Sequence, residues 1–483
     1  MNPAPGSDFL GLDIAAAPPG GRAEWLATAL RAAIADGRLP VGTRLPPTRR
    51  LAAELNVARG TVTEAYRRLT DDGHIEGRGR AGTVVVAAPA APPRAAPPTP
   101  VRPALDAPSD AIFDEMRAVP ARVDFTPGVP DLAAFPRAAW LRAERAVLDA
   151  LVPTDLGYGE PAGHPVLRRA VAQRLGRTRG IRVDPADVVV VAGVAQALAL
   201  LAQVLRDRGI DAVAVEDPGS LGTRQQLQAW GLATPPVPVD GRGARIDALR
   251  ALGAPAVLLT PAHQFPTGVV LDGRRRRELM AWAAGGGLVV EDDYDAEHRY
   301  DRTPVAALAG MLPEQVCYTG SVSKLLAPAL RMGWLVVPPR LRDVVVTARR
   351  RADLGGPAIS QLVLAHLMDS GELDRTLRHV RTRHRRRRDA MIAALREHLP
   401  TAVVHGAAAG LHLTVTFPGT HLSDVDLARA ALERGVKVQP LSWHCQQPRE
   451  PGLVLGYAAA PTAVIRDGVA ALGELLSGYS SAR

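Results

Sequence analysis

The sequence predicts an α/β protein in which a small helical domain precedes a large domain with a mainly parallel sheet. A proline- and alanine-rich segment at 87–108 divides the chain, because prolines at this density oppose both helix and sheet. Apolar residues recur at three- and four-residue spacing before this segment, and short β-branched runs alternate with helical segments after it. The expected parts are a domain at 1–86, a linker at 87–108 and a domain at 109–483, with a smaller α+β subdomain at about 375–483.

The chain has 483 residues, of which 47% are hydrophobic and 22% charged, as is typical of a globular protein with two or three domains. Its formal charge of +9 is compatible with a polyanionic partner. No apolar run approaches a membrane span and the N-terminus lacks a signal-peptide pattern, so we expect a cytoplasmic protein. Cys317 and Cys445 are too few for a disulfide framework, and the histidines lack metal-ligand spacing, so no metal is expected. Cys317 lies in a strand pattern and is expected in the core.

Three helices are expected in the front domain, within "EWLATALRAAIADGRL", "LPPTRRLAAELNV" and "GTVTEAYRRLTDDGHI". A short break at 56–59 separates the second helix from the third, and two short helices joined by a tight turn indicate a helix-turn-helix. After Gly73, "HIEGRGRAGTVVV" predicts two short strands around a glycine- and arginine-rich tip, which would form a wing. The alternative is a plain three-helix domain whose arginines are solvated.

Basic residues lie where a helix-turn-helix needs them. Arg49 opens the second helix, and Arg59 and Thr61 lie at the start of the third, whose N-terminal end enters the major groove. An arginine there can bind guanine through two hydrogen bonds, and Thr61 can reach a phosphate or a base edge. On the wing, Arg78 and Arg80 would favour a minor groove or the DNA backbone. These positions favour DNA binding over the plain three-helix alternative.

The stretch "LPPTRRLAAELNVARGTVTEAYRRLTDDGHIEGRGRAGTVV" resembles the winged helix-turn-helix of GntR-type bacterial transcription regulators, and the resemblance covers about 24–86. One departure is Ala58, where many relatives carry a hydroxyl side chain, so one phosphate contact is expected to be missing. The resemblance implies DNA contacts from Arg49, Arg59, Thr61, Arg80 and Gly82.

In the back domain, polar residues follow strand-like runs such as "DVVVVAG", "GGGLVVEDD" and "QVCYTG". Ligands of parallel sheets bind beyond the carboxyl ends of the strands, which directs attention to these residues. Gly193 precedes a helix start, whose free N–H groups suit a phosphate. Asp292 and Tyr294 follow the second run, and Lys324 follows the third.

Each of these signals has an ordinary structural explanation on its own, such as a solvated acidic turn or a surface lysine. A lysine amine, however, forms an imine with an aldehyde, and hydroxyls with an arginine hold a phosphate. A carboxylate paired to a pyridine nitrogen keeps that nitrogen protonated. Together these groups are what pyridoxal 5′-phosphate (PLP) requires of a protein, so their joint appearance at strand ends favours a PLP site.

The stretch 124–472 resembles the aspartate-aminotransferase-type fold of PLP enzymes, through "YGEPAGHPVLRRAVAQRL", "AGVAQAL", "VEDPG", "TPAHQFPTGV", "VEDDYDAEHRY" and "TGSVSKLLAPALRMGW". The resemblance implies that Lys324 forms the imine with PLP and that Asp292 pairs with the ring nitrogen. It also implies that Tyr294 hydrogen-bonds the phenolic oxygen of the ring.

The same resemblance implies further contacts. His263 or Gln264 is expected near the phenolic oxygen, and Tyr158 is expected to reach the phosphate of a partner subunit, which requires a homodimer. The phosphate is expected to contact the backbone N–H groups of Val194 and Ala195 and the side chains of Ser321, Ser323 and Arg331.

A winged helix, a linker and an aminotransferase-like domain, in this order, resemble the MocR subfamily of regulators, whose described roles include control of vitamin B6 synthesis and of γ-aminobutyrate or taurine use. Aminotransferases clamp the substrate carboxylate with an arginine late in the chain, whereas "GLVLGYAAAP" places Val454 or one of its neighbours there. Ser220 stands where relatives often have an aromatic residue near the cofactor. We therefore expect a PLP-binding transcription regulator that senses PLP or a PLP–amine adduct, with control of vitamin B6 synthesis favoured over amine metabolism.

Two alternatives stay open: an active PLP-dependent aminotransferase with a fused DNA-binding domain, and a regulator whose large domain has lost PLP. The expected PLP-binding regulator is also compatible with a residual half-reaction of transamination. The arginine runs "GRRRRE", "ARRRAD" and "RHRRRRDA" are expected to be solvated helix faces, with contacts to bent DNA as the other possibility.

Overall fold

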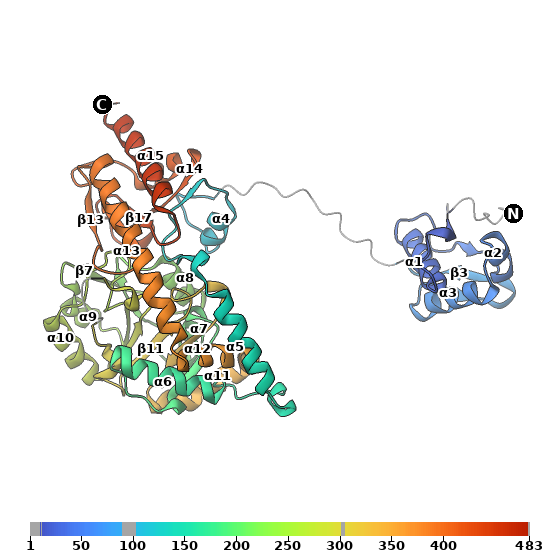
Figure 1. Cartoon of the computed structure of the whole chain (residues 1–483), viewed down its shortest axis with the longest axis horizontal. Helices are drawn as coiled ribbons and strands as arrows, with labels where there is room; N and C mark the ends of the chain where they lie inside the picture. The colour runs from blue at the N-terminus through green and yellow to red at the C-terminus, as the bar shows by residue number, and fades with distance from the viewer. Residues whose placement is uncertain (1–9, 11, 89–102, 301–304, 482–483) are drawn as a thin grey trace. The chain divides into compact units, whose positions relative to one another are not determined.

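The chain divides into two compact units, 1–100 and 101–483 (Figure 1). Most of the expected linker, 89–102, lies outside the described residues. At its far end Leu105 is buried, and its carbonyl accepts a hydrogen bond from Trp443 Nε1 at 2.9 Å, so this end packs on the larger unit. The structure, a computed structural model, describes residues 10, 12–88, 103–300 and 305–481.

The small unit is a three-helix domain with a three-stranded antiparallel sheet of order β1-β3-β2. Val62, Ala65, Tyr66 and Leu69 recur on one face of α3 and are buried, which is the apolar stripe of an amphipathic helix. The predicted winged helix-turn-helix is confirmed. Its elements are α1 (Arg22–Ala35), β1 (Arg44–Leu45), α2 (Thr48–Glu54), α3 (Arg59–Asp71), β2 (Ile75–Gly77) and β3 (Thr83–Val85).

The turn between α2 and α3 depends on Asn56, which adopts a left-handed conformation with φ of 50°. Tyr66 ties α3 back to the segment before α2, because its hydroxyl donates to the Pro46 carbonyl at 2.8 Å. The helix pair is therefore fixed by a local backbone reversal and one buried hydrogen bond, and α3 begins at Arg59.

The large unit is built around an eight-stranded sheet of order β5-β12-β11-β10-β9-β6-β7-β8. The five strands from β11 to β7 are parallel to their neighbours, β12 runs antiparallel between β11 and β5, and β8 runs antiparallel at the other edge. The predicted fold, with a mixed sheet that is parallel at its centre, is confirmed. The strands are β5 (Val188–Val191), β6 (Ala214–Asp217), β7 (Pro236–Asp240), β8 (Gly243–Ala244), β9 (Ala256–Leu259), β10 (Leu288–Asp292), β11 (Val316–Ser321) and β12 (Gly333–Val336).

Helices cover both faces of this sheet, which explains why its strands are apolar without alternation. Val188 and Val190 pack into one core, and Val189 and Val191 into the core on the other face. Cys317 is buried in the second of these cores, as expected. The helices are α5 (Arg137–Ala150), α6 (Pro165–Arg179), α7 (Val194–Asp207), α8 (Leu221–Ala229), α9 (Ile246–Leu252), α10 (Gly273–Ala284), α11 (Pro339–Asp353) and α12 (Ala358–Asp369).

A smaller α+β part follows, and its antiparallel sheet has the order β13-β14-β17-β16. Its core also takes residues from 105–125, which precede the large sheet in the chain, since β4 pairs in parallel with β15. No helix in the described residues is long and apolar enough to cross a membrane. The elements are α4 (Ile112–Ala118), β4 (Val123–Asp124), α13 (Glu372–His398), β13 (Val403–His405), β14 (His412–Thr416), α14 (Asp424–Glu433), β15 (Val436–Lys437), β16 (Gln439–Pro440), β17 (Gly452–Gly456) and α15 (Thr462–Ser481).

Candidate functional site

The parallel pairing of β10 with β11 brings the predicted ring-binding residues together. Asp292 is the last residue of β10 and lies opposite Thr319 of β11, whose hydroxyl donates to Asp292 Oδ1 at 3.1 Å. Lys324 follows β11 by three residues, at the same edge of the sheet. Gly128 lies against this lysine with φ of +78°, and a Cβ added to Gly128 would be 2.9 Å from Lys324 Nζ. A glycine is therefore required where the backbone meets the amine.

Burial sets the protonation states of this pair. It raises the pKa of Asp292 to about 7, against the hydrogen bond from Thr319 and the charge of Lys324. It lowers the pKa of Lys324, against the charges of Asp295 and Asp292. Because the neutral amine is the nucleophile that attacks an aldehyde, the lowered pKa suits Lys324 to bind one.

Tyr294 is held by a histidine and a carboxylate. Its hydroxyl lies 2.9 Å from His263 Nδ1, and both oxygens of the buried Asp295 lie 3.0 Å from the same nitrogen. If His263 Nδ1–H donates to Asp295, the Tyr294 hydroxyl keeps its own hydrogen for an acceptor in the site, such as a phenolate oxygen. Asp295 was missed by the sequence analysis, although it directly follows Tyr294 in a run of acids.

Gln264, the other residue expected beside the phenolic oxygen, is engaged by its own loop and by the loop after β6. Its amide nitrogen donates to the carbonyls of Pro218 at 2.7 Å and Phe265 at 2.5 Å, and its oxygen accepts from Thr267 at 2.6 Å. Its hydrogen bonds therefore shape the turn that presents His263.

The predicted phosphate contacts surround the start of α7. Gly193 precedes this helix with φ of +90°, and a Cβ added there would lie 3.5 Å from a guanidinium nitrogen of Arg331. The backbone N–H groups of Val194 and Ala195 have no acceptor among the described residues. Arg331 itself is left-handed, with φ of 48°, a strain of the kind that collects at binding sites. A helix start facing an arginine is a ready anion site.

Two serines complete the cradle. Ser321 is buried at the end of β11, and its Oγ accepts from the Ser323 backbone N–H at 3.3 Å. Amine, carboxylate, phenol and anion cradle therefore occupy neighbouring positions at one sheet edge, and the set fits PLP. Tyr158 is different, because its side chain is 96% exposed and does not reach this site within its own chain.

The strand expected at the carboxylate clamp carries an uncharged residue, Val454. Val454 lies on buried β17, opposite Thr414 and Gln439, on the strand face whose alternate residues are not part of the subdomain core. On the same face, His412 Nε2 and Thr414 Oγ1 both contact the Pro266 carbonyl, at 3.1 and 2.6 Å. This face therefore borders the His263–Pro266 loop, and Val454 has no donor to offer a carboxylate.

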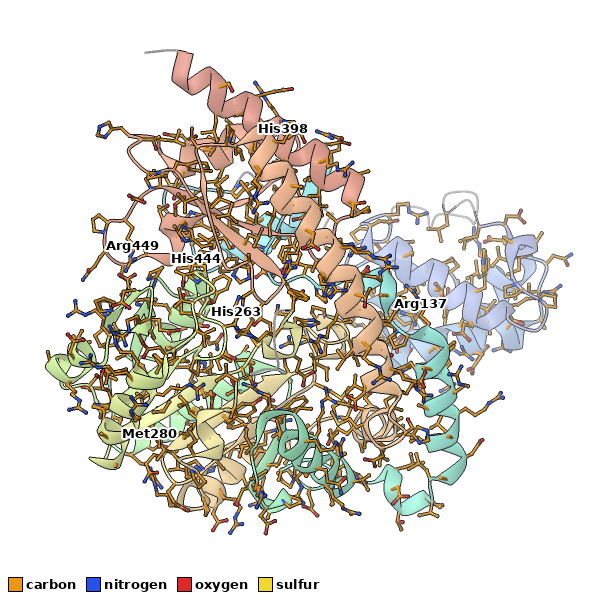
Figure 2. All side chains as sticks on the ribbon, turned by 60° about the vertical axis from the view of Figure 1, so that its left-hand side comes forward. Arg137, His263, Met280, His398, His444 and Arg449 are labelled. Carbon is orange, nitrogen blue, oxygen red and sulfur yellow. The ribbon has the colours of Figure 1, made fainter. Side chains whose placement is uncertain are left out.

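Histidines to which no role was assigned line the same junction. Figure 2 shows His263 and His444 where the small subdomain meets the large one. The ring of His412 is 5.5 Å from that of His263, and the ring of His444 is 5.0 Å from that of Phe265. Burial lowers the pKa of His412 to about 4 and that of His444 to about 3, so both are neutral. Their lack of metal spacing in the sequence gave no sign that they meet here.

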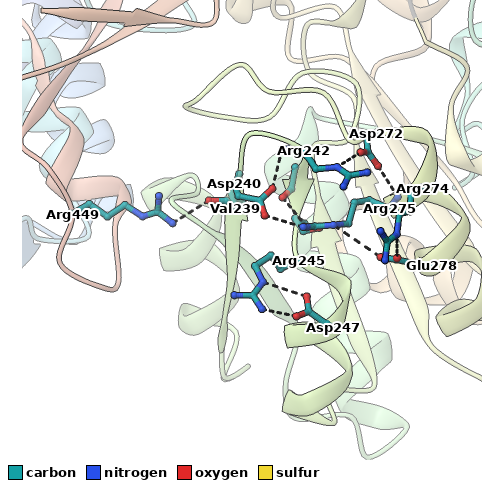
Figure 3. Close-up of polar contacts among 12 residues, drawn as sticks. Val239, Asp240, Arg242, Arg245, Asp247, Asp272, Arg274, Arg275, Glu278 and Arg449 are labelled. Carbon is teal, nitrogen blue, oxygen red and sulfur yellow. Dashed lines mark hydrogen bonds and ion pairs between the residues drawn. The ribbon is translucent and has the colours of Figure 1, made fainter. Parts of the chain in front are cut away.

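The arginine runs are partly structural, and the expectation of solvated faces is wrong for several of their members. In α10, Arg275 donates to Asp240 at 2.8 Å and to the Ala244 carbonyl at 2.7 Å, within the polar cluster of Figure 3. In α13, Arg387 is buried and lies 3.1 Å from Asp131. These guanidinium groups hold distant segments of the fold together.

In the small unit, two arginines predicted to contact DNA differ from the nearby Arg67 in whether they form salt bridges. Arg49 and Arg59 are exposed and have no acidic partner among the described residues, whereas Arg67 pairs with Glu64 at 2.7 Å and with Asp71 at 2.5 Å. Unpaired arginines at the starts of α2 and α3 are free to meet phosphates and bases.

The remaining predicted DNA contacts lie at the start of α3 and on the wing. Thr61 is half-buried in the first turn of α3, and Arg78 is exposed but lies 3.0 Å from Glu76. Gly82 has φ of +84°, and a Cβ there would be 2.7 Å from Arg44 Nε, so the wing tip needs a glycine. The side chain of Arg80 lies outside the described part of the chain.

A winged helix in one unit and a PLP site in the other define a class: a transcription regulator that binds DNA and carries an aminotransferase-like, PLP-binding domain. Residues 123–471 match the family described as aminotransferase class I and II, and residues 22–85 match the bacterial regulatory proteins of the gntR family. The solved structure of LysN, an α-aminoadipate aminotransferase from Thermus thermophilus, has a TM-score of 0.68 and 28% identity, covering 75% of this chain and 93% of its own.

Two relatives share both units. The probable rhizopine catabolism regulatory protein MocR of Rhizobium meliloti is 33% identical over 92% of this chain and 91% of its own. PdxR of Corynebacterium glutamicum, an HTH-type pyridoxine biosynthesis transcriptional regulator, is 32% identical over 93% of this chain and 94% of its own. The chain belongs to the MocR-type regulators of the GntR family.

Proposed function

We propose that this regulator responds to PLP itself and controls genes of vitamin B6 synthesis, as a cytoplasmic homodimer. The observation that carries the proposal is the contrast between Lys324, Asp292 and Tyr294, which suit the cofactor, and Val454, which stands where a substrate carboxylate would be clamped. An amino acid needs charge-assisted donors for its carboxylate, and a valine offers none. PLP needs no such clamp.

The lysine content of the chain supports the role of Lys324. The sequence has only two lysines, Lys324 and Lys437, among 58 basic residues. Lys437 is buried against Asp124, with its Nζ 3.2 Å from the carboxylate. A guanidinium stays protonated and cannot couple to an aldehyde, so an arginine could not replace Lys324.

Each residue at the site has a separate task. When bound, PLP supplies an aldehyde for the lysine and a phosphate that anchors it. Lys324 offers its neutral amine, Asp292 holds a proton at the ring nitrogen, and Tyr294 donates to the phenolic oxygen. The anion is held by Arg331 and by the start of α7.

An exposed apolar surface supports the homodimer. Leu141 and Leu148 on α5, then Val152, Leu156 and Tyr158, are all at least half exposed. A row of large apolar side chains in water favours burial against another protein surface. A second copy of the chain at this row would bring its Tyr158 toward the neighbouring phosphate site.

PLP can change DNA binding only by favouring one arrangement of the dimer over another. We propose that coupling of PLP to Lys324 changes the packing of the large units and thereby the spacing of the two winged helices. Two half-sites on DNA are sensitive to such spacing, since they recur with the helical turn.

The test is a PLP titration of the purified protein, followed by visible absorption and by binding to promoter DNA recovered from genome-wide mapping with and without PLP. Lys324→Ala should abolish both the absorption band and the PLP effect on DNA, while Lys437→Arg should keep both. Recovered sites should lie beside vitamin B6 genes.

A panel of amino acids and amines should leave the absorption band unchanged. Conversion to pyridoxamine phosphate with steady turnover in the presence of a keto acid would establish the aminotransferase instead. An absorption band in Lys324→Ala equal to that of the wild type would contradict the assigned lysine, and sites beside amine catabolism genes would contradict the assigned effector.

A further inference from the structure

Two buried histidines next to Lys324 have no part in the cofactor contacts described above. His298 and His384 are both fully buried, and their ring centroids lie 5.1 Å apart. His298 belongs to the loop after β10, and His384 belongs to α13. The pair therefore joins the cofactor edge of the sheet to the helix that leads into the small subdomain.

The partners of these rings fix where their hydrogens are. His298 Nε2 lies 3.0 Å from the Lys324 carbonyl oxygen, which only accepts, so Nε2 carries the hydrogen and Nδ1 a lone pair. His384 Nε2 accepts from the Asp131 backbone N–H at 3.2 Å, so its hydrogen is on Nδ1. Each neutral ring therefore has one nitrogen still without a hydrogen-bond partner. His298 Nδ1 is an acceptor and His384 Nδ1–H is a donor.

Both remaining nitrogens are buried and lack a partner among the described residues. A buried polar atom without a partner is costly, so native structures rarely keep one. Burial lowers the pKa of both rings, and for His384 the pKa falls to about 2 with help from the charges of Arg387 and Arg383. Both rings are thus neutral, as the assignment of the hydrogens requires.

The surroundings hold the rings in this relation. The His298 backbone is pinned at both ends, since its N–H donates to the Asp295 carbonyl at 2.8 Å and its carbonyl accepts from the Gly410 N–H at 2.9 Å. On α13, Arg381 donates to the Arg299 carbonyl at 2.5 Å. These contacts fix the backbone that carries His298 beside α13, and each ring is oriented by its own Nε2 contact, to the Lys324 carbonyl or to the Asp131 N–H.

We propose that one buried water accepts from His384 Nδ1–H and donates to His298 Nδ1, and that His298 and His384 are positioning residues for Lys324. The chain of hydrogen bonds then runs from the Asp131 backbone through both rings to the Lys324 carbonyl. Through these hydrogen bonds, a displacement of α13 would move the backbone that carries the Lys324 amine. The proposal rests on the proposed role of Lys324.

The hydrogen assignment is tested without PLP, by nitrogen-15 NMR of histidine-labelled protein, with His298→Gln and His384→Gln used to assign the signals. The expected tautomers are Nε2–H for His298 and Nδ1–H for His384. The reverse tautomer at either ring, or a charged ring at neutral pH, would overturn the proposal, and this result holds even if the wild-type protein takes up no PLP.

The positioning role is tested with two substitutions of one residue. Gln places an amide nitrogen where Nε2 was, so His298→Gln keeps the donor to Lys324, whereas His298→Asn loses it. We expect His298→Asn to weaken PLP binding by roughly threefold to tenfold, about one net hydrogen bond, and to shift the pH midpoint of the visible band. His298→Gln should stay within about twofold of the wild type.

His384→Gln keeps the acceptor for Asp131 but loses the donor to the buried water, and should give a smaller change in the same direction. Combined with His298→Gln it should add nothing, because either change already interrupts the chain. Thermal unfolding separates this role from packing. Equal loss of PLP binding and of unfolding temperature in His298→Gln and His298→Asn would refute positioning, as would wild-type PLP binding in His298→Asn.

Discussion

Glu64 of the small unit and three acids of the large unit lie in opposite environments. In the small unit, Glu64 is on the surface, and hydrogen bonds from Arg67 and Arg68 lower its pKa to about 2. In the large unit, burial raises the pKa of an acid at the cofactor edge, Asp292, to about 7. Two further buried acids behave in the same way, each with a pKa of about 7: Glu216 and Glu291. The pKa of Glu64 is therefore set by surface arginines, whereas the pKa values of these three acids of the large unit are raised mainly by burial.

Arginines show the same division. Arg49 and Arg59 of the small unit are exposed and have no acidic partner among the described residues, whereas Arg387 of the large unit is buried and paired. In the sequence, Arg49 is followed by Arg50 and Arg387 lies in the run 385–388, so the local charge does not distinguish these two arginines. The difference arises because Asp131, the partner of Arg387, is brought over by the fold. An arginine thus stays exposed, as predicted for a DNA contact, or becomes a structural tie, depending on what the fold places beside it.

The largest effect is expected from breaking a structural tie in the large unit. Asp131→Asn leaves Arg387 and Arg383 without their shared carboxylate, which is buried. Because an uncompensated buried charge is costly, the free energy of unfolding should fall by about 3 kcal/mol. Denaturant unfolding measures it, with Arg385→Gln, an exposed neighbour on α13, as the control. Equal stability of the two variants would show that Asp131 is not needed to hold α13.

A smaller effect, on DNA alone, is expected from the unpaired arginines. Arg59→Ala should weaken binding to the operator by about 1–3 kcal/mol and relax sequence preference, without changing stability or PLP binding. Arg67→Ala, whose guanidinium is already paired with Glu64 and Asp71, is the matched control and should change operator affinity little. Fluorescence anisotropy at fixed salt compares them. Similar losses in both variants would mean that pairing does not mark the contact residues.

The fold was predictable from the sequence because its signals are local. Apolar spacing marked α3, and continuous β-branched runs marked β5 and β10. Lys324 and Asp292 were found because strand ends are where parallel sheets bind ligands. The structure places these two residues together at one edge, and their role at PLP stays a prediction.

Residues whose role depends on a contact with a distant segment of the sequence could not be predicted in this way. His384 meets Asp131 across 253 positions of sequence, and neither residue is unusual in its own stretch. Asp295 was visible as one acid among several, but its link to His263 depends on how two loops meet. The pairing of polar residues from distant segments is a property of the folded chain, and no local pattern encodes it.

The contrast in acids predicts opposite pH responses. Glu64 has a lowered pKa, so its stabilisation is complete above its unfolded value near 4.5 and is lost as the pH falls toward 2. Asp292 has a raised pKa, so its stabilisation is complete below about 4 and is lost as the pH rises toward 7 in the PLP-free protein. Scanning calorimetry from pH 3 to 8 on the wild type and Asp292→Asn separates the contribution of Asp292 from the opposite contribution of the buried histidines, whose pKa values are lowered. Asp292→Asn should reduce the loss toward pH 7, and an unchanged pH dependence would contradict the raised pKa.

The smallest effect concerns salt. Arg49→Gln should reduce the slope of the logarithm of operator affinity against the logarithm of salt concentration by about one, since one phosphate contact is lost. Arg385→Gln and Arg386→Gln, exposed on α13, should leave the slope unchanged if DNA contacts are confined to the winged helix. A flattened slope in the α13 variants would instead assign that helix to DNA and would contradict the confinement of DNA contacts to the winged helix.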